Sequence, residues 1–175
     1  DYPEDGQAEA GKGARVTRRS ILTLPDACLR EVAVSVTEFD DALSNLAEDM
    51  LDTMYAAPGR GLAGPQIGEM RRIFVMDCSW KEGTPTPRVF VNPKVVATSD
   101  VMVANVEGCL SIPDRLVRIE RPDTITLRWQ ALDGSFLEGT FEGFEAVCVQ
   151  HEADHLDGRL CIDYPDLGPL AEAAE

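Results

Sequence analysis

The sequence predicts an α+β fold in which mixed or antiparallel β-sheets pack around a central helix, with an N-terminal amphipathic helix. Three observations support this class. Apolar residues recur at helical spacing early in the chain, short β-rich runs fill the middle, and a second helical stretch follows them. Neither a repeat nor a long linker divides the 175 residues, so we expect one domain over 16–175 after a flexible N-terminal extension over 1–15.

The amphipathic helix is predicted from apolar side chains that recur three or four positions apart. They are Leu43, Leu46, Ala47, Met50, Leu51, Met54 and Tyr55. Thr37 or Asp40 can cap its start, and Pro58-Gly59 ends it. A short extended segment over 21–24 is expected to precede it.

Strands are predicted where runs of β-branched and aromatic residues are separated by Gly, Pro, Asn and Asp. Four such runs cover 73–76, 88–91, 95–97 and 101–103. The alternating stretch 124–129 is followed by Asp133-Gly134 and then by 135–138, which is the pattern of a β-hairpin.

A second helix is predicted from about Gly143 to Leu156, with Gly158 as its C-terminal cap. One stripe along this helix carries Phe144, Val147, Cys148, His151 and His155. We therefore expect both histidines on the buried face of a core helix.

The two histidines of the chain lie four positions apart, with Glu152 directly after the first. On a helix, their imidazoles face the same side one turn apart and can share one metal ion. This is the His-Glu-x-x-His arrangement, in which the glutamate acts as general base on a metal-bound water. Two unrelated surface histidines are the plainer alternative.

A catalytic metal usually has three protein ligands and an open position for water, so a third ligand is required. Cys109 can supply a thiolate. It lies in the segment 107–113, whose Gly and Pro residues predict a loop between two strands. A carboxylate downstream, from Asp157 or Asp163, is the alternative, and the spacing alone does not decide between them.

Composition argues against several classes of protein. The net charge of −15 speaks against a broad nucleic-acid-binding face, which needs clustered Lys and Arg. Neither a signal peptide nor a run of about 20 apolar residues is visible, so we expect no membrane partner. Five scattered cysteines favour a reducing compartment, so we expect a cytoplasmic protein.

Three segments together resemble the peptide deformylase family of bacterial-type polypeptide deformylases. They are Gly59–Gly68 (GRGLAGPQIG), Glu107–Ser111 (EGCLS) and Gln150–Gly158 (QHEADHLDG). The resemblance covers about 18–165 and implies a deformylase-like catalytic domain over 16–175. It also implies a metal-dependent hydrolase of protein biosynthesis, which removes the formyl group from the formyl-methionine terminus of newly made polypeptides and releases formate.

The resemblance also implies a role for each site residue. The assigned residues are Cys109, His151 and His155 for one divalent metal, Glu152, Gln66 and Leu110 for catalysis, and Gly61, Arg60, Phe144, Val147 and Cys148 for substrate binding. The implied metal is Fe²⁺ in the cell and Zn²⁺ or Ni²⁺ in isolated protein. Glu152 would be the general base, with the Gln66 side-chain amide and the Leu110 backbone N–H as oxyanion donors. Glu107 would pair with Arg121 and brace the Cys109 loop.

The sequence departs from the family pattern at four places, one of which is Asn105, a polar residue near a position that is usually apolar. Gly64 replaces the usual Ala and is expected to loosen the turn before Gln66. Arg60 replaces an apolar residue, and its charge can favour acidic residues after the formyl-methionine. An acidic tail over 167–175 stands where many bacterial members have a basic helix, so we expect only weak contact with the ribosome.

Two other functions remain open at this point. A metallopeptidase shares the His-Glu-x-x-His motif but more often has a His or Glu as its third ligand. A catalytically weak deformylase-like paralogue would bind metal or formyl peptides without turnover.

Overall fold

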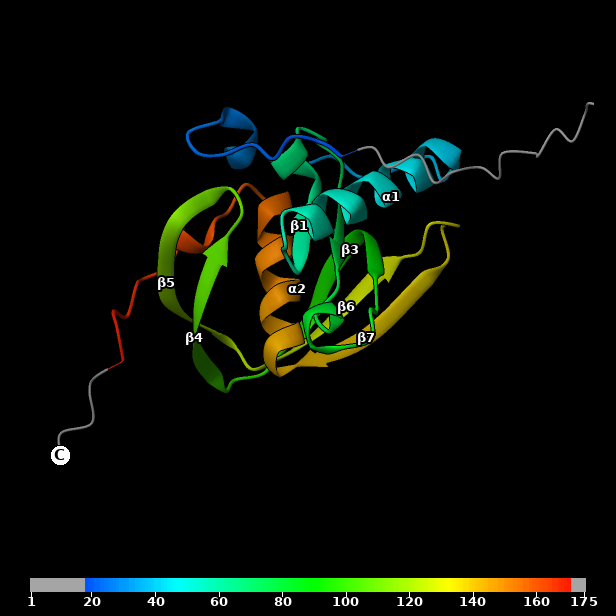
Figure 1. Cartoon of the computed structure of the whole chain (residues 1–175). Coiled ribbons are helices and arrows are strands. Elements are labelled where there is room, and N and C mark those ends of the chain that lie inside the picture. Colours follow the sequence, from blue (N-terminus) through cyan, green and yellow to red (C-terminus); the bar gives the residue numbers. More distant parts are fainter. Residues whose placement is uncertain (1–17, 171–175) are drawn as a thin grey trace, which may run out of the picture.

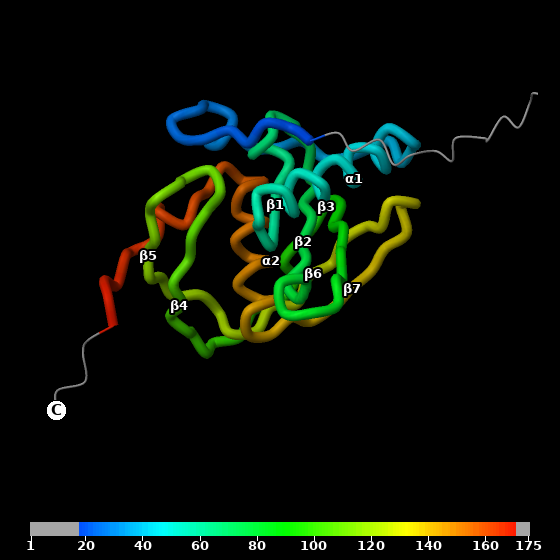
Figure 2. Tube along the Cα trace, in the orientation of Figure 1, coloured from blue at the N-terminus to red at the C-terminus, as the bar shows by residue number. Residues whose placement is uncertain are grey.

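The computed structural model describes residues 18–170, and within this range the chain forms two α-helices and seven β-strands (Figure 1). Five strands form an antiparallel sheet in the order β1-β2-β3-β6-β7, and β4 and β5 form a separate antiparallel pair. The Cα trace shows α2 between the large sheet and the β4–β5 pair (Figure 2). The predicted α+β class is confirmed, and the predicted extension over 1–15 lies outside the described residues.

The bounds of the strands differ from the predicted runs in places. The strands are β1 (Gly61–Ala63), β2 (Ile73–Met76), β3 (Arg88–Thr98), β4 (Met102–Cys109), β5 (Ile112–Pro122), β6 (Thr124–Gln130) and β7 (Phe136–Glu142). The predicted runs 88–91 and 95–97 are one strand, because a bulge between Val91 and Lys94 takes up Asn92 at φ 48° and the following proline. Sequence reasoning did not predict β5, because charged residues interrupt the alternation of apolar and polar side chains along this strand.

The first helix, α1 (Asp41–Ala56), is capped by Asp40, whose side chain accepts a hydrogen bond from the Leu43 N–H at 3.0 Å. Of the two predicted caps, Asp40 is therefore the one used. The apolar face of α1 packs on the strands of the large sheet in one buried cluster. That cluster includes Leu43, Leu46, Met50, Met54, Leu62, Ile73, Val75 and Val91.

The second helix, α2 (Gly143–Leu156), packs against the other face of the sheet, over a cluster that contains Phe74 and Phe90. Gly158 follows the helix at φ +70°, and a Cβ there would lie 2.5 Å from the carbonyl oxygen of Arg30. Only glycine combines this left-handed conformation with such a close approach.

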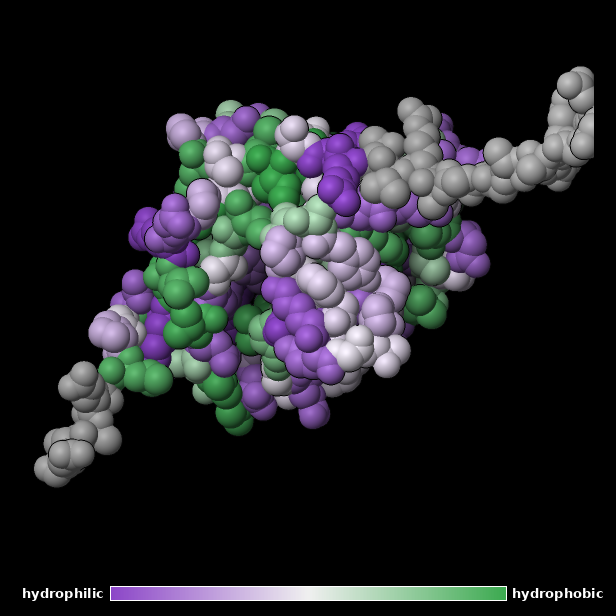
Figure 3. Space-filling view, viewed as in Figure 1, coloured by the Kyte–Doolittle hydropathy of each residue, from purple (hydrophilic) through white to green (hydrophobic). Residues whose placement is uncertain are grey.

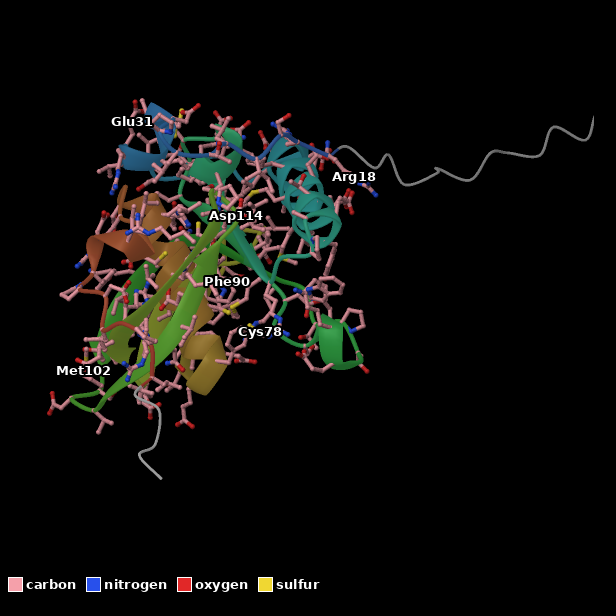
Figure 4. The ribbon with its side chains drawn as sticks, turned by 60° about the vertical axis from the view of Figure 1, so that its left-hand side comes forward. Arg18, Glu31, Cys78, Phe90, Met102 and Asp114 are labelled. Atoms are coloured by element: carbon pink, nitrogen blue, oxygen red, sulfur yellow. The ribbon has the colours of Figure 1, made fainter. Side chains whose placement is uncertain are left out.

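The β4–β5 hairpin packs its inner face on a third cluster, which includes Val117 and Ile119. Figure 4 shows Met102 at one end of this hairpin and Asp114 near its turn at the other. The predicted segment 21–24 is not a strand. Its Leu22 and Leu24 N–H groups donate to the carbonyl oxygens of Gln66 and Ser111, at 2.7 and 3.0 Å.

A buried carboxylate organises the segment after β2. Asp77 accepts hydrogen bonds from the Tyr55 hydroxyl and from the backbone N–H groups of Ser79, Trp80 and Thr86. Burial would raise the pKa of Asp77, but these hydrogen bonds outweigh it and hold the pKa below its usual range. The ionised form therefore ties α1 to the segment 77–86.

We expect Asp77→Asn to lower the free energy of unfolding at pH 7 by about 2 kcal/mol, because buried donors lose a charged acceptor. A carboxyl with a lowered folded pKa stabilises the fold above its unfolded pKa, about 3.9, and this stabilisation disappears as the pH falls through the folded pKa. Urea unfolding should therefore show a difference in unfolding free energy between wild type and Asp77→Asn, and this difference should shrink below about pH 4. Asp100→Asn, at an exposed position, is the control, and a difference independent of pH would contradict the role of the carboxylate.

Candidate metal centre

Three potential metal ligands from distant parts of the chain lie together. The ligand atoms of Cys109, His151 and His155 lie within 4.8 Å of one another, and Sγ of Cys109 is 3.4 Å from Nε2 of His155. Cys109 ends β4, and both histidines come from α2. A thiol and two imidazoles at this separation form a donor set suited to one divalent transition metal.

The alternative third ligands have other partners. Asp157 is 61% exposed and pairs with Arg72, with Oδ1 and Nη1 3.0 Å apart. Asp163 pairs with Arg30. Neither carboxylate belongs to the group around the histidines, so the fold favours the cysteine.

A buried ion pair orients His151. Oε1 of Glu107 lies 2.8 Å from Nδ1 of His151, and the Arg121 guanidinium reaches both carboxylate oxygens of Glu107 at 2.6 and 3.0 Å. The expected Glu107–Arg121 pair is confirmed. Because Nδ1 of His151 is occupied by Glu107, its Nε2 is the nitrogen left to bind a metal.

The two histidines have opposite pKa shifts. Burial, together with the charges of His151 and Arg121, holds the pKa of His155 well below its usual range, so this imidazole is neutral. Burial would also lower the pKa of His151, but its contacts with Cys109 and Glu107 raise it instead. A metal at His151 therefore competes with a proton.

Glu152 lies beside this group and is buried. Its Oε1 is 3.9 Å from Nε2 of His151, and its Oε2 lacks a hydrogen-bond partner among residues 18–170. Burial raises the pKa of Glu152 to about 7, the charge of His151 opposes this rise, and Glu107 adds to it. An unsatisfied carboxyl with this pKa can exchange protons with water near neutral pH.

Gly61 leaves the space that the Glu152 carboxyl occupies. A Cβ on Gly61 would lie 2.7 Å from Oε1 of Glu152, closer than atoms normally approach. Any residue larger than glycine at position 61 would therefore collide with Glu152 in the protein itself, whether or not a substrate is bound.

Gln66 is buried, and its carboxamide is held at both ends. Its Oε1 accepts a hydrogen bond from the Ala63 N–H at 2.9 Å, and its Nε2 donates to Ser111 Oγ at 3.1 Å. The same Nε2 lies 3.8 Å from Sγ of Cys109. The Gln66 side chain therefore adjoins the metal group.

Gly64 was expected to loosen the turn before Gln66, but the turn is closely packed. A Cβ on Gly64 would lie 2.5 Å from the Glu69 carbonyl oxygen and 2.8 Å from that of Arg71. Gly64 thus permits close packing of the turn on the neighbouring backbone.

A pocket of about 570 Å³ opens beside these residues, and Figure 3 shows the surface hollowed next to β4–β5. Of the predicted site residues, those on its walls are Arg60, Gly61, Gln66, Cys109, Leu110, Phe144, Val147, Cys148, His151 and Glu152. His155 is buried and is not among the residues that line the pocket. Sequence reasoning missed Val106 and Leu116, which line the opposite wall, because it did not pair β4 with β5.

Arg60 and Phe144 meet on one wall of the pocket. The Arg60 guanidinium carbon lies 4.9 Å from the centre of the Phe144 ring, and the guanidinium also pairs with Glu82. Phe144 is 49% exposed, so the helical stripe is not buried along its whole length. The charge of Arg60 is compensated by Glu82, which weakens the expected preference for acidic residues.

The helices within residues 18–170 are too short or too polar to cross a bilayer.

Comparisons with known proteins agree with this geometry. The sequence profile described as polypeptide deformylase matches residues 18–168. A curated peptide deformylase from Maricaulis maris is 49% identical over 146 residues, which are 83% of this chain and 84% of that protein. The crystal structure of peptide deformylase from Thermotoga maritima matches with a TM-score of 0.79 and 39% identity, covering 84% of this chain and 97% of that one. The Met-Ala-Ser-bound class I type b peptide deformylase from Acinetobacter baumannii matches with a TM-score of 0.79 and 29% identity, covering 85% of this chain and 99% of that one.

We expect Glu107→Gln to weaken Zn²⁺ binding by about 10–100-fold, because the amide removes the negative charge and one of the two acceptors that hold His151 and Arg121. Competition with a chromophoric chelator measures the affinity. Glu145→Gln, on α2 with His151, is the control, since Glu145 is exposed and contacts only Arg88, at 3.9 Å, among its ion pairs within the described residues. Unchanged affinity in Glu107→Gln would rule out the orienting role.

Proposed function

The chain belongs to the polypeptide deformylase family, and on that premise we propose that it removes the formyl group from the formyl-methionine terminus of newly made polypeptides, releasing formate. The observation that carries this proposal is the group of Cys109, His151 and His155 beside a pocket whose lining includes Glu152 and Gln66. The protein is thus a hydrolase acting in N-terminal processing.

We propose that Cys109, His151 and His155 hold one divalent metal ion, Fe²⁺ in the cell and Zn²⁺ or Ni²⁺ in isolated protein. When bound, such an ion lowers the pKa of a water molecule and polarises a carbonyl oxygen. Zn²⁺ binds most sites more tightly than Fe²⁺ does, so metal availability would decide which ion is present.

In this mechanism Glu152 moves the proton. Its carboxylate takes a proton from the attacking water and later passes it to the amine that leaves the formyl carbon. The pKa of about 7 and the unsatisfied Oε2 support this role, because a base of this pKa can accept and return a proton near neutral pH.

Attack on the formyl carbon places negative charge on its oxygen, which needs donors directed at it. We assign the Gln66 side-chain amide and the Leu110 backbone N–H to this role. The location of both residues on the pocket wall beside Cys109 supports the assignment.

The methionine side chain would enter the pocket along the wall formed by Phe144, Val147 and Cys148. The pocket volume of about 570 Å³ is ample for a methionine side chain. β1 is an edge strand, so its free side can pair with the peptide backbone, with Gly61 and Arg60 beside the chain. The related protein from Acinetobacter baumannii was solved with Met-Ala-Ser, a peptide that begins with methionine.

The other functions are less well supported. A catalytically weak paralogue is not favoured, because Cys109, Gln66 and Glu152 are all present and close together. A metallopeptidase is not favoured either, because the third potential ligand is a cysteine and the family match points to deformylases.

We expect Glu152→Gln to lower kcat for a formyl-Met-Ala peptide by about 10²–10⁴-fold, because the general base is lost. Formate release by anaerobically prepared Fe²⁺ protein measures kcat, and elemental analysis should still find the metal. Glu145→Gln should retain wild-type activity. Substantial turnover by Glu152→Gln would rule out the base, and a metal-loaded wild type without turnover would overturn the proposed function.

We expect Gly61→Ala to lower kcat by roughly 10–100-fold, because its Cβ displaces the Glu152 carboxyl. The same substitution in the Glu152→Gln background should have little further effect on kcat, since the displaced base is already absent. Equal losses in the two backgrounds would show that Gly61 acts through something other than Glu152.

A further inference from the structure

We propose that Ser111 is a positioning residue for catalysis, whose buried hydroxyl holds the Gln66 carboxamide so that one N–H is directed to the reaction site. The inference rests on the proposed function, in which Gln66 donates to the oxyanion. It adds a residue to which neither the sequence analysis nor the family resemblance gave a role.

The carboxamide of Gln66 needs two contacts to be fixed. The terminal torsion of a glutamine side chain is broad, so one contact leaves the plane of the amide free to turn. The Ala63 N–H is a donor that cannot reverse its role, and it therefore decides which end of the amide is the oxygen. The second contact must hold the nitrogen.

Ser111 supplies that second contact. Its Oγ accepts one hydrogen of Gln66 Nε2 at 3.1 Å, and the two side chains are 0% and 1% exposed, respectively. The second hydrogen of Nε2 is directed to the site, where Nε2 lies 3.8 Å from Sγ of Cys109 on the pocket wall. One hydrogen of the amide nitrogen is thus bound by Ser111, and the other is directed to the reaction site.

The backbones of both residues are also tied together. The Leu22 N–H donates to the Gln66 carbonyl oxygen at 2.7 Å, and the Leu24 N–H donates to that of Ser111 at 3.0 Å. The segment 22–24 therefore sets the spacing between the turn that carries Gln66 and the β4–β5 connection that carries Ser111. With this spacing set, the hydroxyl contact fixes the direction of the amide.

A donor that is oriented before the reaction stabilises charge that develops in the transition state. Loss of this orientation should reduce kcat and leave KM nearly unchanged, because the formyl oxygen carries little charge in the bound substrate. Removing an entire donor costs about 10²–10³-fold in related chemistry, so misdirecting one should cost less, about tenfold.

We therefore expect Ser111→Ala to lower kcat for a formyl-Met-Ala peptide about tenfold, with a KM within about twofold of wild type and unchanged metal content. Thr53→Ala is the matched control, since Thr53 is also buried and its hydroxyl bonds the Asp49 carbonyl oxygen at 2.7 Å, away from the pocket. Ser111→Cys keeps one polar atom at this position, larger and a weaker acceptor than the hydroxyl, and should give an intermediate kcat. It replaces the alanine variant if that variant does not fold.

A double-mutant cycle separates positioning from general support of the fold. In a Gln66→Ala background, Ser111→Ala should change kcat by less than about twofold, because no amide remains to be oriented. An equal loss in both backgrounds would overturn the proposal.

Side-chain amide NMR of Gln66 provides a readout independent of turnover. The Nε2 group should be rigid in wild type and in Thr53→Ala, and mobile in Ser111→Ala. A Gln66 amide that stays rigid without the hydroxyl would overturn the proposal even if kcat fell. A wild type that releases no formate would instead refute the proposed function, while the NMR result would still report on the contact.

Discussion

The buried carboxylate of Glu107 is the interaction on which the rest of the site depends. It joins β4 to β5 through Arg121 and both strands to α2 through His151. A carboxylate buried without partners would cost several kcal/mol, so the bidentate guanidinium and the imidazole N–H make this position tenable. Arg121 in turn reaches Asp154 on α2, at 2.8 Å. The same contacts that join the two sheets across α2 therefore determine which nitrogen of His151 faces a metal.

The segment that carries Gly61 and Gln66 is held in place from outside the metal group. The Trp80 indole N–H donates to the Gly59 carbonyl oxygen at 2.9 Å, and Asp77 accepts from the Trp80 backbone N–H. A chain of hydrogen bonds thus leads from a buried carboxylate to the pocket wall. Catalysis requires donors and bases to be in place before the reaction, because rearranging them during it would add to the barrier.

The elements that were predicted well are those with a local signal. The first helix follows from apolar periodicity, the second from the stripe that ends in the two histidines and from Gly158 as its cap, and the β6–β7 hairpin from alternation with Asp133-Gly134 at its turn. β5 was missed because one of its faces is charged and exposed, and its inner face is recognised only once β4 lies beside it. The pocket wall at Val106 and Leu116 was missed for the same reason, since an exposed apolar residue has no meaning until its neighbours are known.

The sequence by itself determined the pair of histidines and the neighbouring Glu152, because helix geometry alone places residues four apart on one face. The sequence also offered Cys109 as one of several third ligands, and the family resemblance then assigned it to the metal and added Gln66 through its motif. Only the tertiary structure decided that Cys109, rather than Asp157 or Asp163, joins the histidines, and that Gly61 must leave room for Glu152. Ser111 likewise acquires a role only beside Gln66. These relations depend on contacts between residues dozens of positions apart, and local sequence patterns carry no record of such contacts.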